Sequence, residues 1–348
     1  MPTLWKDLSK IEDYPAHLEA CWKEHLAARA DNAPTVISTF AGGGGSSLGY
    51  SMAGFRELLA VEWDDNAVAT LKENFHDVPV YHGDIAKLSA EQILSMTGLK
   101  PRELDVFDGS PPCQGFSTAG KRIIDDSRNQ LFREYVRLLR ELQPKVFVME
   151  NVSGMVKGKM KIIFVEILQE LKASGYRVSA KLLNAMWFGV PQSRERMIFI
   201  GVRNDLKVEP SHPKAQCAPI EAGKIKEVDI PCMKHSDRVG RIWERLSYGH
   251  SADELSDSKG NGFGITKVNP HKPCPTIVKG WSSGNGLLHW DKKRFLSVPE
   301  CAQIGSFGLN YKFCGNPDDA IKRIGNSVPP LFMRAIAMHI RKEILEHA

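Results

Sequence analysis

The sequence lacks paired cysteine motifs and long apolar runs. Its seven cysteines are scattered through 348 residues without any Cys-x-x-Cys pair, which argues for a reducing compartment and against structural zinc. His271 and Cys274 have a spacing that two zinc ligands could have, but the sequence contains no second such pair. We therefore expect no bound metal. No stretch approaches the ~20 apolar residues of a membrane span, and the first residues contain no apolar signal core. These absences predict a cytoplasmic protein.

Internal repeats, low-complexity tracts and a large excess of one charge are also absent. Hydrophobic residues make up 42% and charged residues 25% of the chain, and the length suggests one large domain plus a smaller one. The net charge of +5 and the pI of about 8.7 are compatible with a polyanionic partner, although many small-molecule enzymes are equally basic. Composition therefore limits domain number but not function.

Four segments differ in residue pattern and define the predicted domains. Residues 1–33 form an amphipathic arm that either packs on the main domain or contacts a partner. Residues 34–203 alternate strand and helix patterns, as in a catalytic and cofactor-binding α/β domain. This alternation stops over residues 204–290, where Pro, Lys, His and Ser dominate, and a smaller irregular domain is expected there. Helical periodicity returns over residues 291–348, which are expected to rejoin the first domain.

A β-branched run over residues 34–40 leads directly into the glycine-rich segment 41–49. A strand, a glycine turn and a helix start many nucleotide-binding α/β units, because glycines allow close backbone approach and the helix N-terminus offers free N–H groups. The dinucleotide fingerprint fails, since Ser47 and Leu48 occupy the positions of its last glycine in the two registers. The phosphate-loop pattern fails as well, because Tyr50 stands where its lysine must be. Another ligand is therefore expected, the alternative being a flexible turn.

Acidic residues recur at the ends of the next predicted strands. Glu62 could accept hydrogen bonds from a ribose diol, and the adjacent Trp63 could stack on a flat base. Asp84, after the following strand, could accept from an exocyclic amine. Each alone could be a surface residue, but together they lie at the sheet edge where ligands bind. They predict an adenosine-type cofactor.

Cys113 lies on a stiff loop after the predicted strand 104–108. Pro111 and Pro112 fix φ and remove two backbone donors, so the cysteine loses little freedom when it meets a reacting atom. Taken alone, Cys113 is either a nucleophile or a structural buried thiol. Glu150 leaves another predicted strand and could face the same pocket, or be a solvated strand-end acid.

Two arginines, Arg194 and Arg196, occupy positions i and i+2 of a predicted extended segment. Alternate side chains of a strand point to the same side, so both could clamp an oxygen or a phosphate. The alternative is a charged surface loop.

Together these motifs resemble those of the DNA (cytosine-5)-methyltransferases. The resemblance runs from Phe40 to the C-terminus and follows the motif order of that family. The matching segments are Phe40-Ala41-Gly42-Gly43-Gly44-Gly45, Glu62-Trp63, Asp84-Ile85, Pro111-Pro112-Cys113-Gln114, Glu150-Asn151-Val152, Gln192-Ser193-Arg194-Glu195-Arg196, Arg294-Phe295-Leu296-Ser297-Val298-Pro299-Glu300 and Gly325-Asn326-Ser327-Val328. Ser38-Thr39 departs from the Asp-Leu that is common in the family, and the arm before Pro34 lies outside the family core.

The resemblance implies a Rossmann-like α/β fold that binds S-adenosyl-L-methionine, with residues 204–290 as the target-recognition domain. The implied cofactor residues are Phe40, Gly42, Gly44, Gly45, Glu62, Trp63, Asp84, Ile85, Pro112, Leu131, Asn326, Ser327 and Val328. It also implies that the Cys113 thiolate adds to cytosine C6, which makes C5 electron-rich. Glu150 would favour protonation at N3, while Arg196, supported by Arg194, would hold O2.

The implied substrate is a cytosine flipped out of double-stranded DNA. Gln114, Ser117 and Arg128 are the implied DNA contacts on the nucleophile loop, and the recognition domain would read base edges in the major groove. A cognate restriction endonuclease is an implied partner, and we expect a monomer. One alternative is a tRNA cytosine-5 methyltransferase, although the Cys-Phe-Thr element usual in those relatives is absent. The other is a catalytically inactive DNA-binding protein on the same fold.

Overall fold

The computed structural model describes residues 11–112, 130–156, 160–230, 237–255, 264–279 and 286–348. The chain divides into two compact units. The sheet unit contains Ala27–Asn184, Glu195–Lys214 and Met333–Ala348, and the accessory unit contains Met1–Leu26, Ala185–Arg194 and Ala215–Phe332. Each unit is described by itself.

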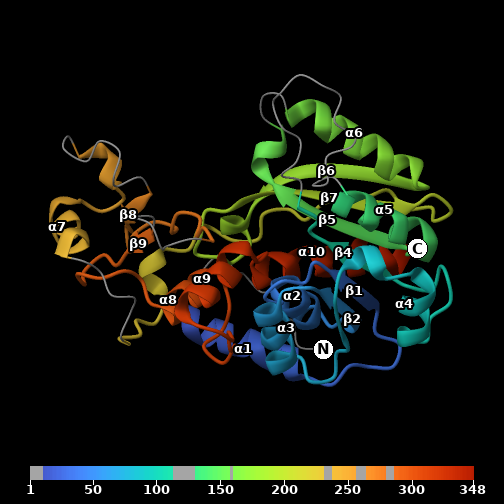
Figure 1. Ribbon diagram of the computed structural model, residues 1–348, viewed down its shortest axis with the longest axis horizontal. Helices are drawn as coiled ribbons and strands as arrows, with labels where there is room; N and C mark the ends of the chain where they lie inside the picture. The colour runs from blue at the N-terminus through green and yellow to red at the C-terminus, as the bar shows by residue number, and fades with distance from the viewer. Residues whose placement is uncertain (1–10, 113–129, 157–159, 231–236, 256–263, 280–285) are drawn as a thin grey trace. The chain divides into compact units, whose positions relative to one another are not determined.

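A seven-stranded sheet forms the centre of the sheet unit, in the order β3-β2-β1-β4-β5-β7-β6 (Figure 1). The strands are β1 (Thr35–Thr39), β2 (Arg56–Glu62), β3 (Val80–His82), β4 (Val106–Gly109), β5 (Val146–Val152), β6 (Tyr176–Asn184) and β7 (Glu195–Arg203). Strands β3, β2, β1, β4 and β5 are parallel, whereas β7 runs antiparallel to both β5 and β6. Because β1 and β4 are buried at every residue, both faces of the sheet centre are covered.

Helices cover the sheet of this unit. They are α2 (Gly45–Met52), α3 (Asp65–Asn74), α4 (Ala90–Thr97), α5 (Gln130–Leu142), α6 (Met160–Ala173) and α10 (Pro330–Glu343). One face carries the main apolar cluster, in which Ile37, Phe107 and Phe199 of the sheet pack with residues of α4, α5 and α6. The spacing of apolar residues along α5 is helical, and it places Phe132, Tyr135, Leu138, Leu139 and Leu142 on one buried face. The opposite face packs against α2, which contacts β1 and β2.

The described part of the accessory unit has few regular elements. They are α1 (Tyr14–Leu26), α7 (Asp237–Arg245), α8 (Val298–Ile304), α9 (Pro317–Asn326) and the short parallel strands β8 (Ile265–Lys267) and β9 (Gly286–Leu288), besides single 3-10 turns. Helix α1 packs within this unit, where Tyr14 is fully buried and donates a hydrogen bond to the carbonyl of Gln303 at 3.3 Å. Among the described residues, no helix combines the length and apolarity needed to cross a bilayer.

The observed units differ from the predicted domain boundaries. Residues 291–332 group with the accessory unit, and only Met333–Ala348 of the C-terminal segment belongs to the sheet unit. The reason is pairing with residues earlier in the chain, which a periodicity pattern does not reveal. Phe295 forms a bridge with Leu288 of β9, and Gln303 of α8 exchanges hydrogen bonds with the backbone of Lys226 at 2.9 and 2.8 Å.

Candidate active site

The glycine-rich segment turns sharply between β1 and α2. Phe40, Gly42 and Gly44 all have positive φ, at 54°, 55° and 74°. Such values are easy for glycine but costly for Phe40, which marks this turn as a strained segment. The backbone N–H of Gly44 donates to the carbonyl of Ala41 at 2.9 Å and closes the turn. The predicted strand–glycine turn–helix unit is therefore present.

A cavity of about 360 Å³ lies at the carboxyl edge of β1, β2 and β3. Its lining consists of Phe40, Val61, Glu62, Trp63, Gly83, Asp84, Ile85, Pro112 and Leu131. The structure thus brings together seven of the predicted cofactor residues. Val61 and Gly83 were not predicted, and their only sequence signal is that each directly precedes a predicted acid.

Glu62 connects this cavity to the glycine turn. One carboxylate oxygen accepts from the N–H of Gly42 at 2.7 Å, and the other accepts from Trp63 and Asp64 at 2.8 and 3.0 Å. A carboxylate can accept about four hydrogen bonds, so capacity for a further donor from a ligand is left. Glu62 therefore both fixes the turn and offers an acceptor in the cavity.

Trp63 and Asp84 line the same cavity and offer it different groups, an aromatic ring and a carboxylate. The Trp63 side chain is 77% exposed, which is unusual for so large an aromatic ring and suits stacking on a flat ligand. Asp84 caps a 3-10 turn by accepting from the N–H of Ala86 at 3.0 Å through one oxygen. Its second oxygen can accept from a ligand. The combination of a diol acceptor, a stacking ring and an amine acceptor fits an adenosine group.

The other predicted cofactor residues do not line this cavity. Gly44 and Gly45 are buried at the start of α2. Asn326, Ser327 and Val328 belong to the accessory unit, where Asn326 ends α9 and the Ser327 hydroxyl donates to the carbonyl of Arg323 at 2.7 Å. Their contact with a cofactor stays a prediction.

A buried ion pair joins β5 and β7. The Arg196 Nε lies 2.7 Å from a carboxylate oxygen of Glu150, and the two side chains are only 14% and 11% exposed. Glu150 is paired with Ile198 and Arg196 with Val152, so the charged residues are diagonal neighbours on one face of the sheet. Because β7 is antiparallel, its first residues lie at the carboxyl end of β5. The pair therefore lies at the strand exit predicted for Glu150, and it brings Arg196 to that exit as well.

Arg194 has different partners from Arg196. Its side chain is 2% exposed, and it donates to the carbonyls of Ile277 and Gly325 at 3.2 and 2.8 Å within the accessory unit. The prediction of a shared clamp assumed strand alternation, but β7 begins only at Glu195 and Arg194 precedes it. In this structure Arg194 holds backbone segments together.

The predicted nucleophile Cys113 and the predicted DNA contacts Gln114, Ser117 and Arg128 lie outside the described residues. The described chain fixes where their loop begins. Asn151 donates from Nδ2 to the carbonyl of Pro111 at 3.1 Å, and Pro112 is exposed at the cavity. Asn151 was not predicted as a site residue, although it adjoins Glu150 in the sequence.

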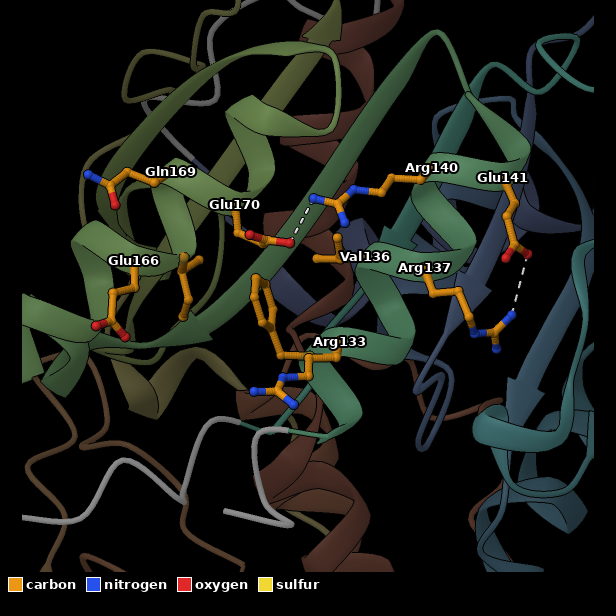
Figure 2. Close-up of a pocket in the computed structure, with 10 residues that line it drawn as sticks. Arg133, Val136, Arg137, Arg140, Glu141, Glu166, Gln169 and Glu170 are labelled. Atoms are coloured by element: carbon orange, nitrogen blue, oxygen red, sulfur yellow. Dashed lines mark hydrogen bonds and ion pairs between the residues drawn. The ribbon is translucent and has the colours of Figure 1, made fainter. Parts of the chain in front are cut away.

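A second cavity of about 680 Å³ lies between α5 and α6 (Figure 2). Its arginines Arg137 and Arg140 are paired with glutamates, Arg140 with Glu170 at 2.7 Å and Arg137 with Glu134 at 2.7 Å and Glu141 at 3.4 Å. Arg137 also donates to the carbonyl of Leu88 at 2.8 Å. Of these pairs, only Arg140–Glu170 joins α5 to α6, and both Arg137 pairs lie within α5, so these two arginines already have acidic partners. The first cavity and the Glu150–Arg196 pair are the better candidate for a site.

The sheet order, the antiparallel β7 and a ligand-type cavity at the glycine turn define a Rossmann-like α/β methyltransferase fold. A family model described as C-5 cytosine-specific DNA methylase matches residues 34–342. The chain belongs to this C-5 cytosine-specific DNA methylase family.

Individual relatives agree with this assignment. The chain is 33% identical over 342 residues to the type II methyltransferase M.NgoPII of Neisseria gonorrhoeae, covering 90% of this chain and 97% of that protein. It is 33% identical over 327 residues to the type II methyltransferase M1.HphI of Haemophilus parahaemolyticus, covering 88% and 87%. A prophage-encoded protein of E. coli, assigned as a DNA modification methyltransferase, superposes with a TM-score of 0.73 at 27% identity, covering 90% of this chain and all of that one.

Proposed function

We propose that the protein transfers a methyl group from S-adenosyl-L-methionine to C5 of a cytosine flipped out of duplex DNA, through a covalent adduct between Cys113 and C6. The observation that carries this proposal is the buried Glu150–Arg196 pair at the strand exit next to the one that leads to Cys113. Family membership and the names of the relatives support DNA as the substrate class.

The residues of the cavity support S-adenosyl-L-methionine as the methyl donor. When bound, this cofactor supplies an electrophilic methyl group on a sulfonium. Glu62 would accept from the ribose hydroxyls, Trp63 would stack on the adenine, and Asp84 would accept from its amino group.

The chain's own residues would activate the base. Addition of the Cys113 thiolate to C6 moves electron density to C5, which then attacks the methyl group. Glu150 would hold the N3 and N4 edge of the base and favour a proton at N3, which drains charge from the adduct. Arg196 keeps the Glu150 carboxylate in place and would hold O2. Loss of the C5 proton and of the thiolate then restores the aromatic ring.

The accessory unit would read the DNA. Lys267 is only 8% exposed and its Nζ lies 3.6 Å from the Trp243 ring centroid, so this cation stabilises the unit, whereas the neighbouring Tyr248 ring is 41% exposed and would be available to contact DNA. A cognate restriction endonuclease acting on the same site is the proposed partner, because relatives are named type II methyltransferases. A monomer and a cytoplasmic location stay predictions.

Duplex DNA and tRNA substrates test the proposed function. Tritiated methyl groups from S-adenosyl-L-methionine are expected in cytosines of duplex DNA and not in tRNA. Mapping the methylated cytosines would then give the recognition sequence. Label confined to tRNA would favour the tRNA alternative, and label in neither would favour the inactive DNA-binding protein.

The Trp63→Ala variant should weaken cofactor binding. Loss of one base-stacking ring costs about 1–3 kcal/mol, so the Kd for S-adenosyl-L-methionine should rise roughly 5- to 150-fold. Calorimetric titration measures it, with Trp63→Phe expected to keep most of the affinity. Met96→Ala on α4, which removes another exposed apolar side chain from the same unit, is the matched control. If Trp63→Ala and Met96→Ala bound S-adenosyl-L-methionine with the same Kd, Trp63 would not contact the cofactor.

The Glu150→Gln variant should lose turnover while keeping cofactor affinity. Without the carboxylate, N3 protonation is no longer favoured, and a positioned acid–base group contributes on the order of 10²–10⁴-fold. Steady-state kinetics should show the loss in kcat, and the Kd for cofactor should stay within about twofold because Glu150 does not line the cavity. Glu166→Gln on the exposed side of α6 is the control. A Glu150→Gln enzyme with full kcat would contradict the proposed role.

A further inference from the structure

Acidic side chains are buried on the face of the sheet that α2 covers. Asp108 of β4 is 2% exposed and Glu57 of β2 is 9% exposed. The Ser47 hydroxyl, in the first turn of α2, donates to Glu57 at 2.8 Å. Polar groups in a core normally have a structural or functional reason, because burying them is costly.

Asp108 contacts both the cofactor helix and the neighbouring strand. The Tyr50 hydroxyl of α2 donates to the Asp108 carboxyl at 3.2 Å, and the Thr39 hydroxyl of β1 donates to the Asp108 backbone carbonyl at 2.9 Å. Tyr50 lies on the helix that follows the glycine turn, and Asp108 lies five residues before Cys113 in the sequence. This contact therefore links the cofactor turn to the strand that leads to the nucleophile.

The end of β4 is also held from the opposite face. A Cβ atom at Gly109 would lie 2.5 Å from Thr39 Oγ1 and 2.6 Å from Tyr135 Cε2, so only glycine fits without a shift. The Tyr135 hydroxyl donates to the carbonyls of Phe107 and Val148, at 3.3 and 3.2 Å. The end of β4 is thus closely packed on both faces.

Titratable groups surround Asp108 from every element packed on it. They are Tyr50 from α2, Glu57 from β2, Tyr135 from α5 and Glu150 from β5. Burial raises the pKa of Asp108 to about 8 and that of Glu57 to about 7. Asp108 is therefore neutral at pH 7, and a buried carboxylate appears in this contact only at alkaline pH.

We propose that Asp108 is a positioning residue, which through Tyr50 couples the cofactor-loop helix α2 to the strand β4 and its nucleophile loop. This inference rests on the proposed methyl transfer. It predicts that cutting the contact lowers kcat for methyl transfer while leaving cofactor affinity intact, because neither Tyr50 nor Asp108 lines the cofactor cavity.

Tyr50→Phe, Asp108→Val and the double variant test the coupling, because phenylalanine has no hydroxyl to donate and valine has no oxygen to accept. Each single change should lower kcat about five- to tenfold, with the Kd for S-adenosylhomocysteine within twofold of wild type. The double variant should be no worse than the worse single one, since both remove the same contact. The control is Tyr176→Phe, which removes a buried hydroxyl that donates to the Pro144 carbonyl at 2.9 Å in the same unit. It should leave kcat unchanged.

The pH profile separates this role from a merely structural one. Asp108→Asn, whose amide oxygen still accepts from Tyr50, should keep wild-type kcat at pH 7, where Asp108 is neutral, and should lack any change that wild type shows as the pH rises through about 8. If Asp108→Val does not fold, Tyr50→Phe still decides, because its ring keeps the packing against Phe55. Unchanged kcat in Tyr50→Phe, or losses of kcat that add in the double variant, would overturn the coupling. The proposed function would still stand in that case, because it depends on the activity of the wild type. A wild type that methylates no cytosine substrate would instead overturn the proposed function.

Discussion

The Cys113→Ser variant is expected to abolish methyl transfer. A serine hydroxyl ionises far less than a thiol and adds poorly to C6, so kcat should fall at least about 10³-fold. Methyl incorporation into duplex DNA measures this loss. Duplex DNA containing 5-fluorocytosine should trap a covalent complex with wild type in the presence of cofactor, because fluorine at C5 cannot leave as a proton. The variant should form no such complex.

Two further measurements test whether the loss of kcat comes from the missing thiol and not from weaker cofactor binding or a general effect of replacing a cysteine. Cys113→Ser should bind S-adenosylhomocysteine as wild type does, because the described cavity lining ends at Pro112 on this loop. Cys314→Ser replaces a half-buried cysteine of the accessory unit and should keep full activity. If Cys113→Ser retained more than a tenth of wild-type kcat, or if Cys314→Ser lost as much, the covalent mechanism would have to be abandoned.

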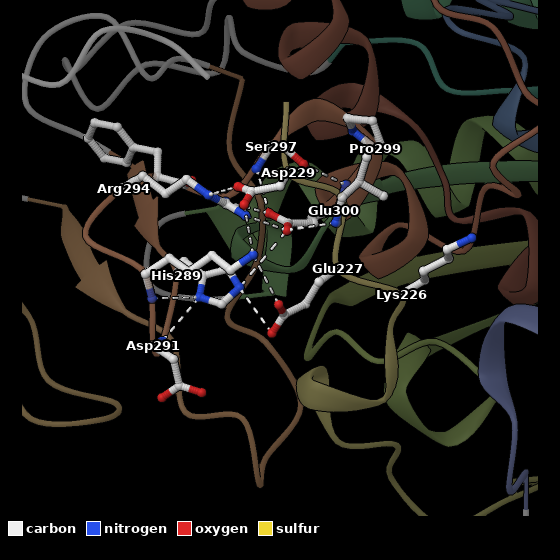
Figure 3. A network of polar contacts seen from close by, with 12 residues as sticks. Lys226, Glu227, Asp229, His289, Asp291, Arg294, Ser297, Pro299 and Glu300 are labelled. Carbon is white, nitrogen blue, oxygen red and sulfur yellow. Dashed lines mark hydrogen bonds and ion pairs between the residues drawn. The ribbon is translucent and has the colours of Figure 1, made fainter. Parts of the chain in front are cut away.

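A second large effect is expected in the accessory unit, where Glu300 lies at the centre of a polar network (Figure 3). Glu300 is completely buried, and both of its oxygens accept from the Arg294 guanidinium at 2.8 Å. The backbone N–H groups of Ser297 and Val228 also donate to it, at 2.7 and 3.2 Å. The network thus joins residue 228, the loop before α8 and the first turn of α8.

Glu300→Gln should strongly destabilise the accessory unit. Removing one member of a buried ion pair leaves the other charge without its partner, which typically costs about 3–5 kcal/mol. Chemical denaturation followed by fluorescence measures the loss. Glu19→Gln, which breaks the exposed Glu19–Lys23 pair of the same unit, should have little effect. A Glu300→Gln protein as stable as this control would mean that the ion pair does not hold the unit together.

The stabilisation by Glu300 should also depend on pH. Burial raises the pKa of its carboxyl, but the hydrogen bonds from Arg294, Ser297 and Val228 outweigh that effect, so the pKa lies below the ordinary 4.5. The contribution is therefore present above pH 4.5 and is lost as the pH falls through the lowered folded-state pKa. The stability difference between wild type and Glu300→Gln should shrink in that acid range.

Local chemistry made part of the site predictable from the sequence. The glycine turn, Glu62 and Asp84 each follow a β-branched or apolar run, and strand exits in a parallel sheet share one edge. The apolar spacing of α5 was equally readable, because helical periodicity is set by nearest neighbours along the chain. The sequence showed Asp108 only as the last residue of a predicted strand. No neighbouring residue predicted its contact with Tyr50.

Other features depended on residues distant in the chain. The separate role of Arg194 follows from carbonyls more than 80 residues away, and from β7 starting one residue later. The pairing of Arg196 with Glu150 required an antiparallel strand, which composition does not indicate. The grouping of residues 291–332 with the accessory unit rests likewise on long-range contacts.

The sequence by itself determined the fold class, the order of the motifs and seven of the residues that line the cavity at the glycine turn, because these depend on local strand, turn and helix patterns. Only the tertiary structure decided which charges meet. It paired Glu150 with Arg196, enclosed Arg194 and placed Tyr50 against Asp108. The physical reason is that burial and long-range pairing set the charge state and direction of a side chain, and neither is encoded within a few residues of it.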